Sequence, residues 1–220
     1  ALYPAEHTYG LTVIGSHEEL QPSTVDDFVR FFNTCYVPNN ASLVVAGDCD
    51  TVQARQWIDA YFGSIPKGTL PERSKPEPRM GPEKAVVVTT DNVQIPLTLI
   101  AWHTAAAFEP GDAALDVLAS ILGEGRSSRL YADLVPEKGQ ALEVSAWQYS
   151  QLLSGIFAVS GKPAEGVTVE ELETSLQGHL QSIAHEGPTA VELERVRNQL
   201  VVQFISQLEG LDQRASALNR

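Results

Sequence analysis

Histidines are the side chains of this sequence best suited to metal chemistry, and there are five of them: His7, His17, His103, His179 and His185. Zinc-assisted hydrolysis needs three protein ligands on the metal, a fourth position for water, and a carboxylate that takes the proton of that water. None of the five lies three or four residues from another, so no helix can present two of them together. We therefore assign no catalytic residue and no metal ligand to this chain.

The nearest imitation of a zinc motif is His17-Glu18-Glu19-Leu20-Gln21, which begins like H-E-x-x-H but has glutamine where the second ligand would stand. We interpret this segment as a solvated turn. His103 falls in an expected strand and is interpreted as a packed or capped side chain. His179 and His185 are six residues apart, so on one helix they point to nearly opposite sides.

A glycine-rich loop, Gly123-Glu124-Gly125-Arg126, is the second candidate for function. It follows an apolar run over 112–122 with leucine and isoleucine at helical spacing. Ser127 or Ser128 is expected to cap a second helix, which Pro136 and Gly139 end. Glycine-rich loops that bind phosphate join a strand to a helix, whereas this loop joins two helices, so phosphate binding is only weakly indicated. Two interpretations stay open: a helix cap followed by a turn, or a loop that contacts substrate.

The elements around this loop predict the fold class. Strands are expected at 84–90, 95–104, 142–149 and 155–160, with Leu142, Val144 and Ala146 on the buried face of the third. Thr168 is expected to cap a helix to about 185, and Thr189 with Glu192 forms a capping box for the last helix. The order β-β-α-α-β-β-α-α predicts an α+β fold, with helices packed on one face of an antiparallel-rich mixed sheet.

The first part of the chain reads differently. A helix capped by Ser23 or Thr24 is expected to about 33, then a turn at 38–40, a strand at 41–48 and a helix at 51–61. Residues 66–83 hold five of the thirteen prolines and almost no apolar residue, which is typical of a linker. We therefore divide the chain into 1–65, a proline-rich linker 66–83, and 84–220.

Composition narrows the functional class. A hydrophobic content of 43%, a charged content of 20% and a formal net charge of −13 indicate a globular protein and disfavour nucleic acid or an anionic membrane as partner. A basic peptide would be attracted instead. No apolar run is long enough to span a membrane. Cys35 and Cys49 are too few for a disulfide framework, and whether they pair with each other stays open.

Three separated motifs together resemble the pitrilysin/insulinase family of zinc peptidases, the inverzincins, to which the mitochondrial processing peptidase belongs. They are the segment 112–150 with its "SSRLY", the stretch "YGLTVIGSHEELQPSTVDDFVRFFNTCYVPNNASLVVAGD" over 9–48, and "TAVELERVRNQLVVQF" over 189–204. The resemblance covers nearly the whole chain. It implies that 1–65 is the tail of a first peptidase module and 84–220 the start of a second, inactive one.

The same resemblance implies where the chemistry lies. The family holds zinc through H-x-x-E-H, which precedes the segment that starts here, so zinc is expected in the full-length protein or its partner and not in this fragment. Some second modules also offer an arginine and a tyrosine to the substrate carbonyl. Alignment on the "SSRL" motif places Val135 and Leu142 there, and neither side chain can donate a hydrogen bond. Arg129 and Tyr131 lie nearby but belong to the "SRLY" helix.

The expected function is therefore that of a noncatalytic portion of a zinc endopeptidase, which helps enclose and position a peptide or unfolded protein. Its expected partners are the upstream zinc-bearing module and further subunits of a homo- or hetero-oligomer, with Gly123, Glu124, Gly125 and Arg126 as candidate substrate contacts. The alternative is a scaffold or noncatalytic partner subunit of the same fold. The sequence leaves the compartment open between bacterial periplasm and cytoplasm.

Overall fold

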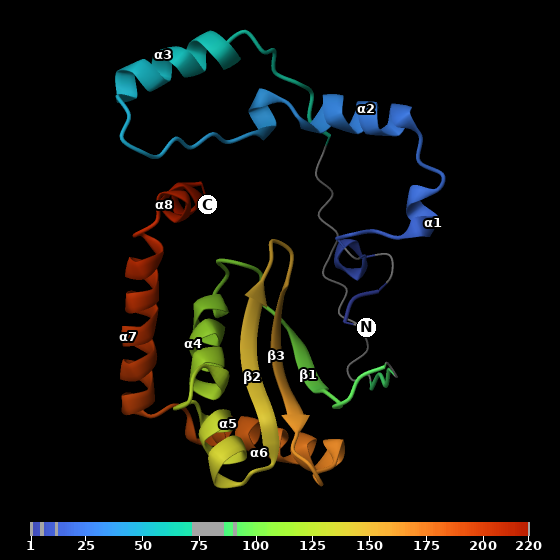
Figure 1. Cartoon of the computed structure of the whole chain (residues 1–220), viewed down its shortest axis with the longest axis vertical. Coiled ribbons are helices and arrows are strands. Elements are labelled where there is room, and N and C mark those ends of the chain that lie inside the picture. The colour runs from blue at the N-terminus through green and yellow to red at the C-terminus, as the bar shows by residue number, and fades with distance from the viewer. Residues whose placement is uncertain (1, 5–6, 12, 72–85, 90–91, 220) are drawn as a thin grey trace. The chain divides into compact units, whose positions relative to one another are not determined.

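The computed structural model describes residues 2–4, 7–11, 13–71, 86–89 and 92–219 (Figure 1). The chain divides into two compact units. The sheet unit comprises Ala1–Leu11 and Lys75–Gln199, and the helical unit comprises Thr12–Ser74 and Leu200–Arg220. Most of the expected linker, 72–83, lies outside the described residues, so the three-part division of the chain stays a prediction.

An antiparallel sheet of three strands is the centre of the sheet unit. The strands are β1 (Thr98–Thr104), β2 (Ala141–Ser150) and β3 (Gly155–Pro163), in the order β1-β3-β2. β3 pairs with both neighbours, so that Phe157 stands opposite Trp102 on one side and Gln148 on the other. The expected hairpin is confirmed, and both of its strands are longer than the sequence indicated.

Helices cover one face of this sheet, as expected for the α+β class. They are α4 (Asp112–Gly123), which packs on β2, α5 (Arg129–Ala132), and α6 (Val169–Glu186), which packs on β3 (Figure 1). The approach of α6 is close, because a Cβ at Gly161 would lie 2.9 Å from Leu172 Cδ2. The fully buried apolar side chains gather between these layers: Ile121, Leu122, Leu130, Leu134, Val159, Leu172, Leu176 and Val196. The predicted fold class is confirmed.

A bulge changes which residues of β2 face the core. Val144 is buried as expected, but Leu142 is 55% exposed and Ala141 is buried in its place. The register shifts between Ala141 and Glu143, which pair with Pro163 and Lys162 in turn. An extra residue in one strand interrupts the inward–outward alternation, so the expectation that Leu142 faces inward was wrong.

The second helix ends in an unexpected way. α5 continues into a π-helical turn, η3 (Asp133–Glu137), which contains Pro136. Proline does not end the helix here. A π turn relaxes the spacing of the backbone hydrogen bonds, and the chain leaves it at Gly139, whose φ is +62°.

The long helices of the chain begin where the sequence predicted. α6 starts after Thr168, which forms a capping box with Glu171. α7 (Ala190–Gln207) follows Thr189, whose N–H and hydroxyl donate to Glu192 Oε2 at 2.8 and 2.9 Å. α8 (Leu211–Leu218) is the last element.

The helical unit contains α1 (His17–Leu20), α2 (Val25–Cys35) and α3 (Thr51–Phe62), besides the end of the chain. A capping box between Thr24 and Asp27 begins α2, and the Asp50 side chain caps α3. Both helices were predicted within two residues of their observed bounds. Neither contains a buried residue.

Two expected strands are irregular in their described residues. The apolar segment 41–48 has no strand structure, and Leu43 and Val45 are more than half exposed. The described part of the other segment, 86–89, is also irregular. A strand needs a hydrogen-bonded neighbour, and within the described residues neither segment has one. The expectation of a strand at 41–48 was therefore wrong, and the expectation for 84–90 fails over 86–89, while 84, 85 and 90 lie outside the described residues.

Candidate functional site

The glycine-rich loop begins where α4 meets the sheet. A Cβ at Gly123 would stand 2.1 Å from the backbone nitrogen of Ala146 in β2, so only glycine permits this contact. Gly125 has a φ of +77°, a left-handed conformation that glycine adopts at low cost. Both glycines therefore have a structural role, whichever ligand the loop contacts.

Ser128 closes the loop. Its Oγ donates to the carbonyl of Gly125 at 2.7 Å and its backbone N–H donates to the same oxygen at 3.2 Å. The residue stands at the N-cap position of α5, as expected, but its side chain holds the loop instead of capping the helix. The tip, from Gly125 to Ser127, is exposed. Among the described residues, no ion pair or hydrogen bond to the Arg126 guanidinium is found.

Arg129 joins the loop to the start of α7. Its Nε donates to Glu192 Oε1 at 2.5 Å, and its Nη2 donates to Glu192 Oε2 at 2.8 Å and to the Gly187 carbonyl at 3.0 Å. Both side chains are about four-fifths buried. We call this arrangement of Arg129, Glu192 and Gly187 the clasp. Its partners are 63 residues apart in sequence, so no local motif could have predicted it.

The clasp has a strong electrostatic signature. The Arg129 guanidinium, with help from Thr189, lowers the pKa of Glu192 from 4.5 to about 2, although burial opposes the shift. The same bond raises the pKa of Arg129. Glu192 therefore serves two elements, because it caps α7 through Thr189 and binds Arg129. Arg129 is thus engaged in the structure, which leaves no support for it as a substitute for the family's substrate-binding arginine.

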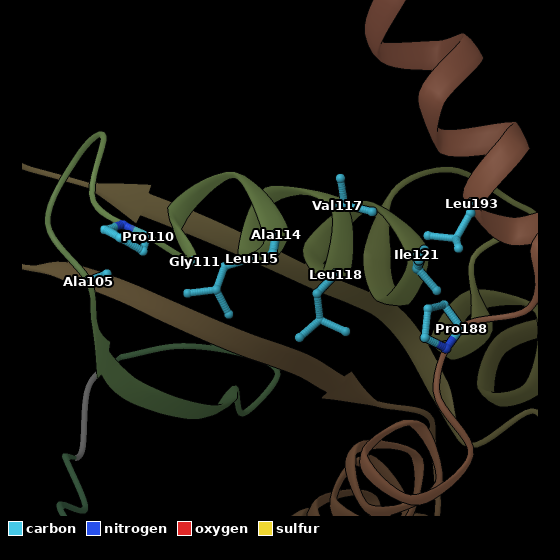
Figure 2. A pocket seen from close by; sticks show the side chains of 10 residues that line it. All are labelled: Ala105, Pro110, Gly111, Ala114, Leu115, Val117, Leu118, Ile121, Pro188 and Leu193. Carbon is cyan, nitrogen blue, oxygen red and sulfur yellow. The ribbon is translucent and has the colours of Figure 1, made fainter.

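An apolar groove runs along α4 beside the clasp (Figure 2). Its volume is about 710 Å³. Leu115, Leu118 and Ile121 line it from α4, and Pro188 and Leu193 form the end next to Gly187 and Glu192 (Figure 2). The groove offers contact area for apolar groups, with no polar side chain in its lining to fix their orientation.

Three of the five histidines, His7, His103 and His179, make contacts away from the loop. His103 Nε2 lies 2.7 Å from the Leu2 carbonyl, and His7 accepts a hydrogen bond from the N–H of Tyr9. His179 Nε2 lies 2.7 Å from Asp133 Oδ2, which also accepts from Lys138. The segment at His17 is a one-turn helix instead of the expected turn, because the N–H of Leu20 reaches the carbonyl of Ser16.

Within the described residues, the donor set does not fit zinc. The described residues contain no group of three histidine, cysteine or acidic side chains close enough to share an ion. Cys35 and Cys49 are free thiols. The positions that align with the family's arginine and tyrosine carry Val135, which is half-buried in η3, and the exposed Leu142, neither of which can donate a hydrogen bond. Within the same described ranges, no helix has the length and apolarity to cross a membrane.

Helices cover one face of an antiparallel sheet, and the described part contains a glycine-rich loop and no cluster of metal ligands, which makes this an α+β domain. Residues 23–200 match the family model described as the peptidase M16 inactive domain. The chain belongs to the peptidase M16 family and carries its inactive domain. The resemblance to pitrilysin-type zinc peptidases is thereby confirmed.

Similar proteins agree with this assignment. The chain is 28% identical over 211 residues to the zinc protease PqqE of Helicobacter pylori. This alignment covers 93% of this chain and 47% of that protein. A crystal structure of a protease from Helicobacter pylori superposes with a TM-score of 0.80 at 26% identity, over 96% of this chain and 52% of that one. A chain of complex III2 from Candida albicans shares the fold, with a TM-score of 0.74 at 19% identity over 97% of this chain and 52% of that one. The chain thus spans about half the length of the proteins it matches.

Proposed function

We propose that this chain is the noncatalytic portion of a zinc-dependent endopeptidase of the pitrilysin type, where it helps enclose and position a peptide. The observation that carries the proposal is the match of 23–200 to a peptidase inactive domain, together with relatives named zinc proteases that are about twice as long. Zinc would be held by the full-length protein or a partner subunit and would supply the activated water. This chain would supply surface that binds the substrate.

In this proposal the loop Gly123–Arg126 contacts the peptide. Its tip is exposed, its backbone is fixed by Ser128, and Arg126 offers a guanidinium to peptide carbonyls or carboxylates. A basic unfolded substrate would be attracted more strongly than a neutral or acidic one, because the chain has a net charge of −13.

The proposed division of the chain follows the family. Residues 1–65 would complete a first module and 84–220 would begin a second, inactive one. The exposed apolar faces of α2 and α3 agree with a first module whose remaining elements come from elsewhere in the parent. The assembly would be a homo- or hetero-oligomer in which two halves surround the peptide.

A scaffold or noncatalytic partner subunit is the second candidate. The fold shared with a chain of complex III2 from Candida albicans favours it. Fold alone does not separate the two functions.

The experiment compares the chain with its full-length parent on a quenched fluorescent peptide that has no stable structure. The parent with zinc should cleave the peptide and lose activity in EDTA, and an Arg126→Ala variant of it should turn over more slowly at low substrate concentration. A parent that is inert with zinc would favour the scaffold. Unchanged turnover by Arg126→Ala would remove the loop from the substrate site.

A further inference from the structure

Arg129 of the clasp lies just after the glycine-rich loop in sequence, so its contacts can fix the position of the loop. Arg126 and Arg129 are separated only by Ser127 and Ser128, and Ser128 is fully buried. Whatever fixes Arg129 in space therefore also fixes one end of the loop. The other end is fixed at Gly123, which contacts the backbone of β2.

We propose that Arg129 is a positioning residue, which holds the loop Gly123–Arg126 against the start of α7 so that Arg126 is presented to peptide substrate from a fixed backbone. The inference rests on the proposed function for its substrate, but its structural half stands on the clasp alone. Arg129 does not itself contact the substrate. It acts through the loop on one side and through Glu192 and Gly187 on the other.

The geometry distinguishes this role from ordinary surface pairing. Arg129 makes a paired bond to one carboxylate and a third bond to a backbone carbonyl, a planar arrangement that lysine cannot reproduce. The ion pair of Lys162 with Glu143, in contrast, is a single contact between two exposed side chains. Such exposed pairs contribute little.

The clasp also sets one end of the apolar groove. Gly187 and Glu192 immediately precede Pro188 and Leu193 in sequence, and these two residues line the end of the groove next to Ile121 (Figure 2). Releasing Arg129 would therefore loosen the loop and this end of the groove together. A peptide that contacts both Arg126 and the groove would lose affinity through two connected surfaces.

The test is hydrogen exchange of the amides of Glu124 and Ser128, which donate to the carbonyl of Ser120 at the end of α4 and to the carbonyl of Gly125 in the loop. Arg129→Ala should speed exchange at these two amides by about tenfold or more, while the amides of β3 change little. Arg129→Lys should recover only part of the protection. Thr189→Ala weakens the cap of α7 but leaves the Arg129–Glu192 bond, so it should leave loop exchange nearly unchanged. Lys162→Ala is the matched control for loss of one surface cation.

The second arm measures fluorescence anisotropy of a labelled, unfolded peptide containing lysine and leucine. Wild type and Lys162→Ala should bind alike, and Arg126→Ala and Arg129→Ala should both bind more weakly, by about tenfold. Unchanged loop exchange in Arg129→Ala would overturn the positioning role, and so would a rise in exchange spread evenly over the whole sheet unit. A wild-type chain that binds no peptide would instead overturn the proposed function, and the exchange result would still decide the role of Arg129.

Discussion

The sheet unit and the helical unit use the same local signals but differ in what those signals achieve. Thr168 with Glu171 and Thr24 with Asp27 form the same capping box, and each begins a helix where the sequence predicts. Yet the buried apolar core found among the described residues lies between Ala106 and Val196, all within the sheet unit. In the helical unit, Phe28, Phe31 and Phe32 of α2 are each more than half exposed.

Local sequence is therefore enough to form a helix, whereas an apolar core requires a second layer of structure to pack against. α4 and α6 have a sheet beneath them, and their apolar residues reach exposures near zero. The apolar faces of α2 and α3 meet no such layer within their own unit. Most helical stability in proteins comes from packing of this kind, so the two units should respond very differently to equivalent substitutions.

The largest effect should follow from a methyl group at the junction of α4 and β2. Gly123→Ala places a Cβ 2.1 Å from the Ala146 nitrogen, and backbone atoms cannot move aside as a flexible side chain can. We expect a loss of more than about 4 kcal/mol in the free energy of unfolding, or no cooperative folding, as measured by urea denaturation.

Gly178→Ala in α6 is the matched control, because the residue is exposed and nothing lies within 4 Å of the position that the new Cβ would take. It should stabilise the chain by up to about 1 kcal/mol. Similar results for the two glycine variants would contradict the close packing of α4 on β2.

A direct comparison of the two units uses one large apolar side chain from each. Leu130→Ala removes a fully buried side chain and should cost about 2–5 kcal/mol. Phe32→Ala removes a larger side chain that is 57% exposed and should cost less than about 1 kcal/mol. Equal losses in urea unfolding would mean that α2 packs into a core.

Breaking the clasp should have an intermediate effect that depends on pH. Arg129→Ala leaves the largely buried Glu192 carboxylate without its cation, at an expected cost of about 2 kcal/mol near pH 7. Glu192 has a folded-state pKa of about 2, below its usual 4.5, so its contribution is present above the usual value and is lost as pH falls toward the folded one.

The stability difference between wild type and Glu192→Gln, measured by thermal or urea unfolding, should therefore narrow as pH falls below about 4.5. Glutamine keeps an oxygen that can accept from Thr189, so this variant isolates the charge from the cap. A difference that stays constant from pH 7 to pH 3 would show that the carboxylate charge contributes nothing.

The smallest effect should come from the two equivalent caps. Thr168→Ala should cost about 1 kcal/mol in the main unfolding transition, because α6 belongs to the cooperative core. Thr24→Ala should lower the helical circular dichroism signal slightly and leave that transition unchanged. A shift of the main transition by Thr24→Ala would show that α2 unfolds together with the core of the sheet unit.

The sequence predicted what depends on neighbours along the chain. Caps at Thr24, Thr168 and Thr189, and the alternation that buries Val144, are local signals, and the structure places them as expected. The outward turn of Leu142 depends on one extra residue in the pairing of β2 with β3, which no single strand reveals. The apolar segment 41–48 fails for the same reason, since a strand is defined by its partner.

The candidate site likewise has one part that local sequence predicts and one part that it does not. The exposed glycine-rich loop could be found from sequence, although its contact with substrate remains a prediction. The clasp could not, because Arg129 and Glu192 are joined only by the packing of α5 near the start of α7. Glu192 was recognised for its cap on α7, and its second role appears only in three dimensions.

The proposed function requires this chain to bind peptide for a zinc peptidase without cleaving it. One doubly labelled unfolded peptide tests both halves of the claim in a single titration with zinc present, since anisotropy reports binding and loss of quenching reports cleavage. We expect a saturable rise in anisotropy with no release of quenching over hours. Cleavage by the purified chain that EDTA abolishes would contradict it.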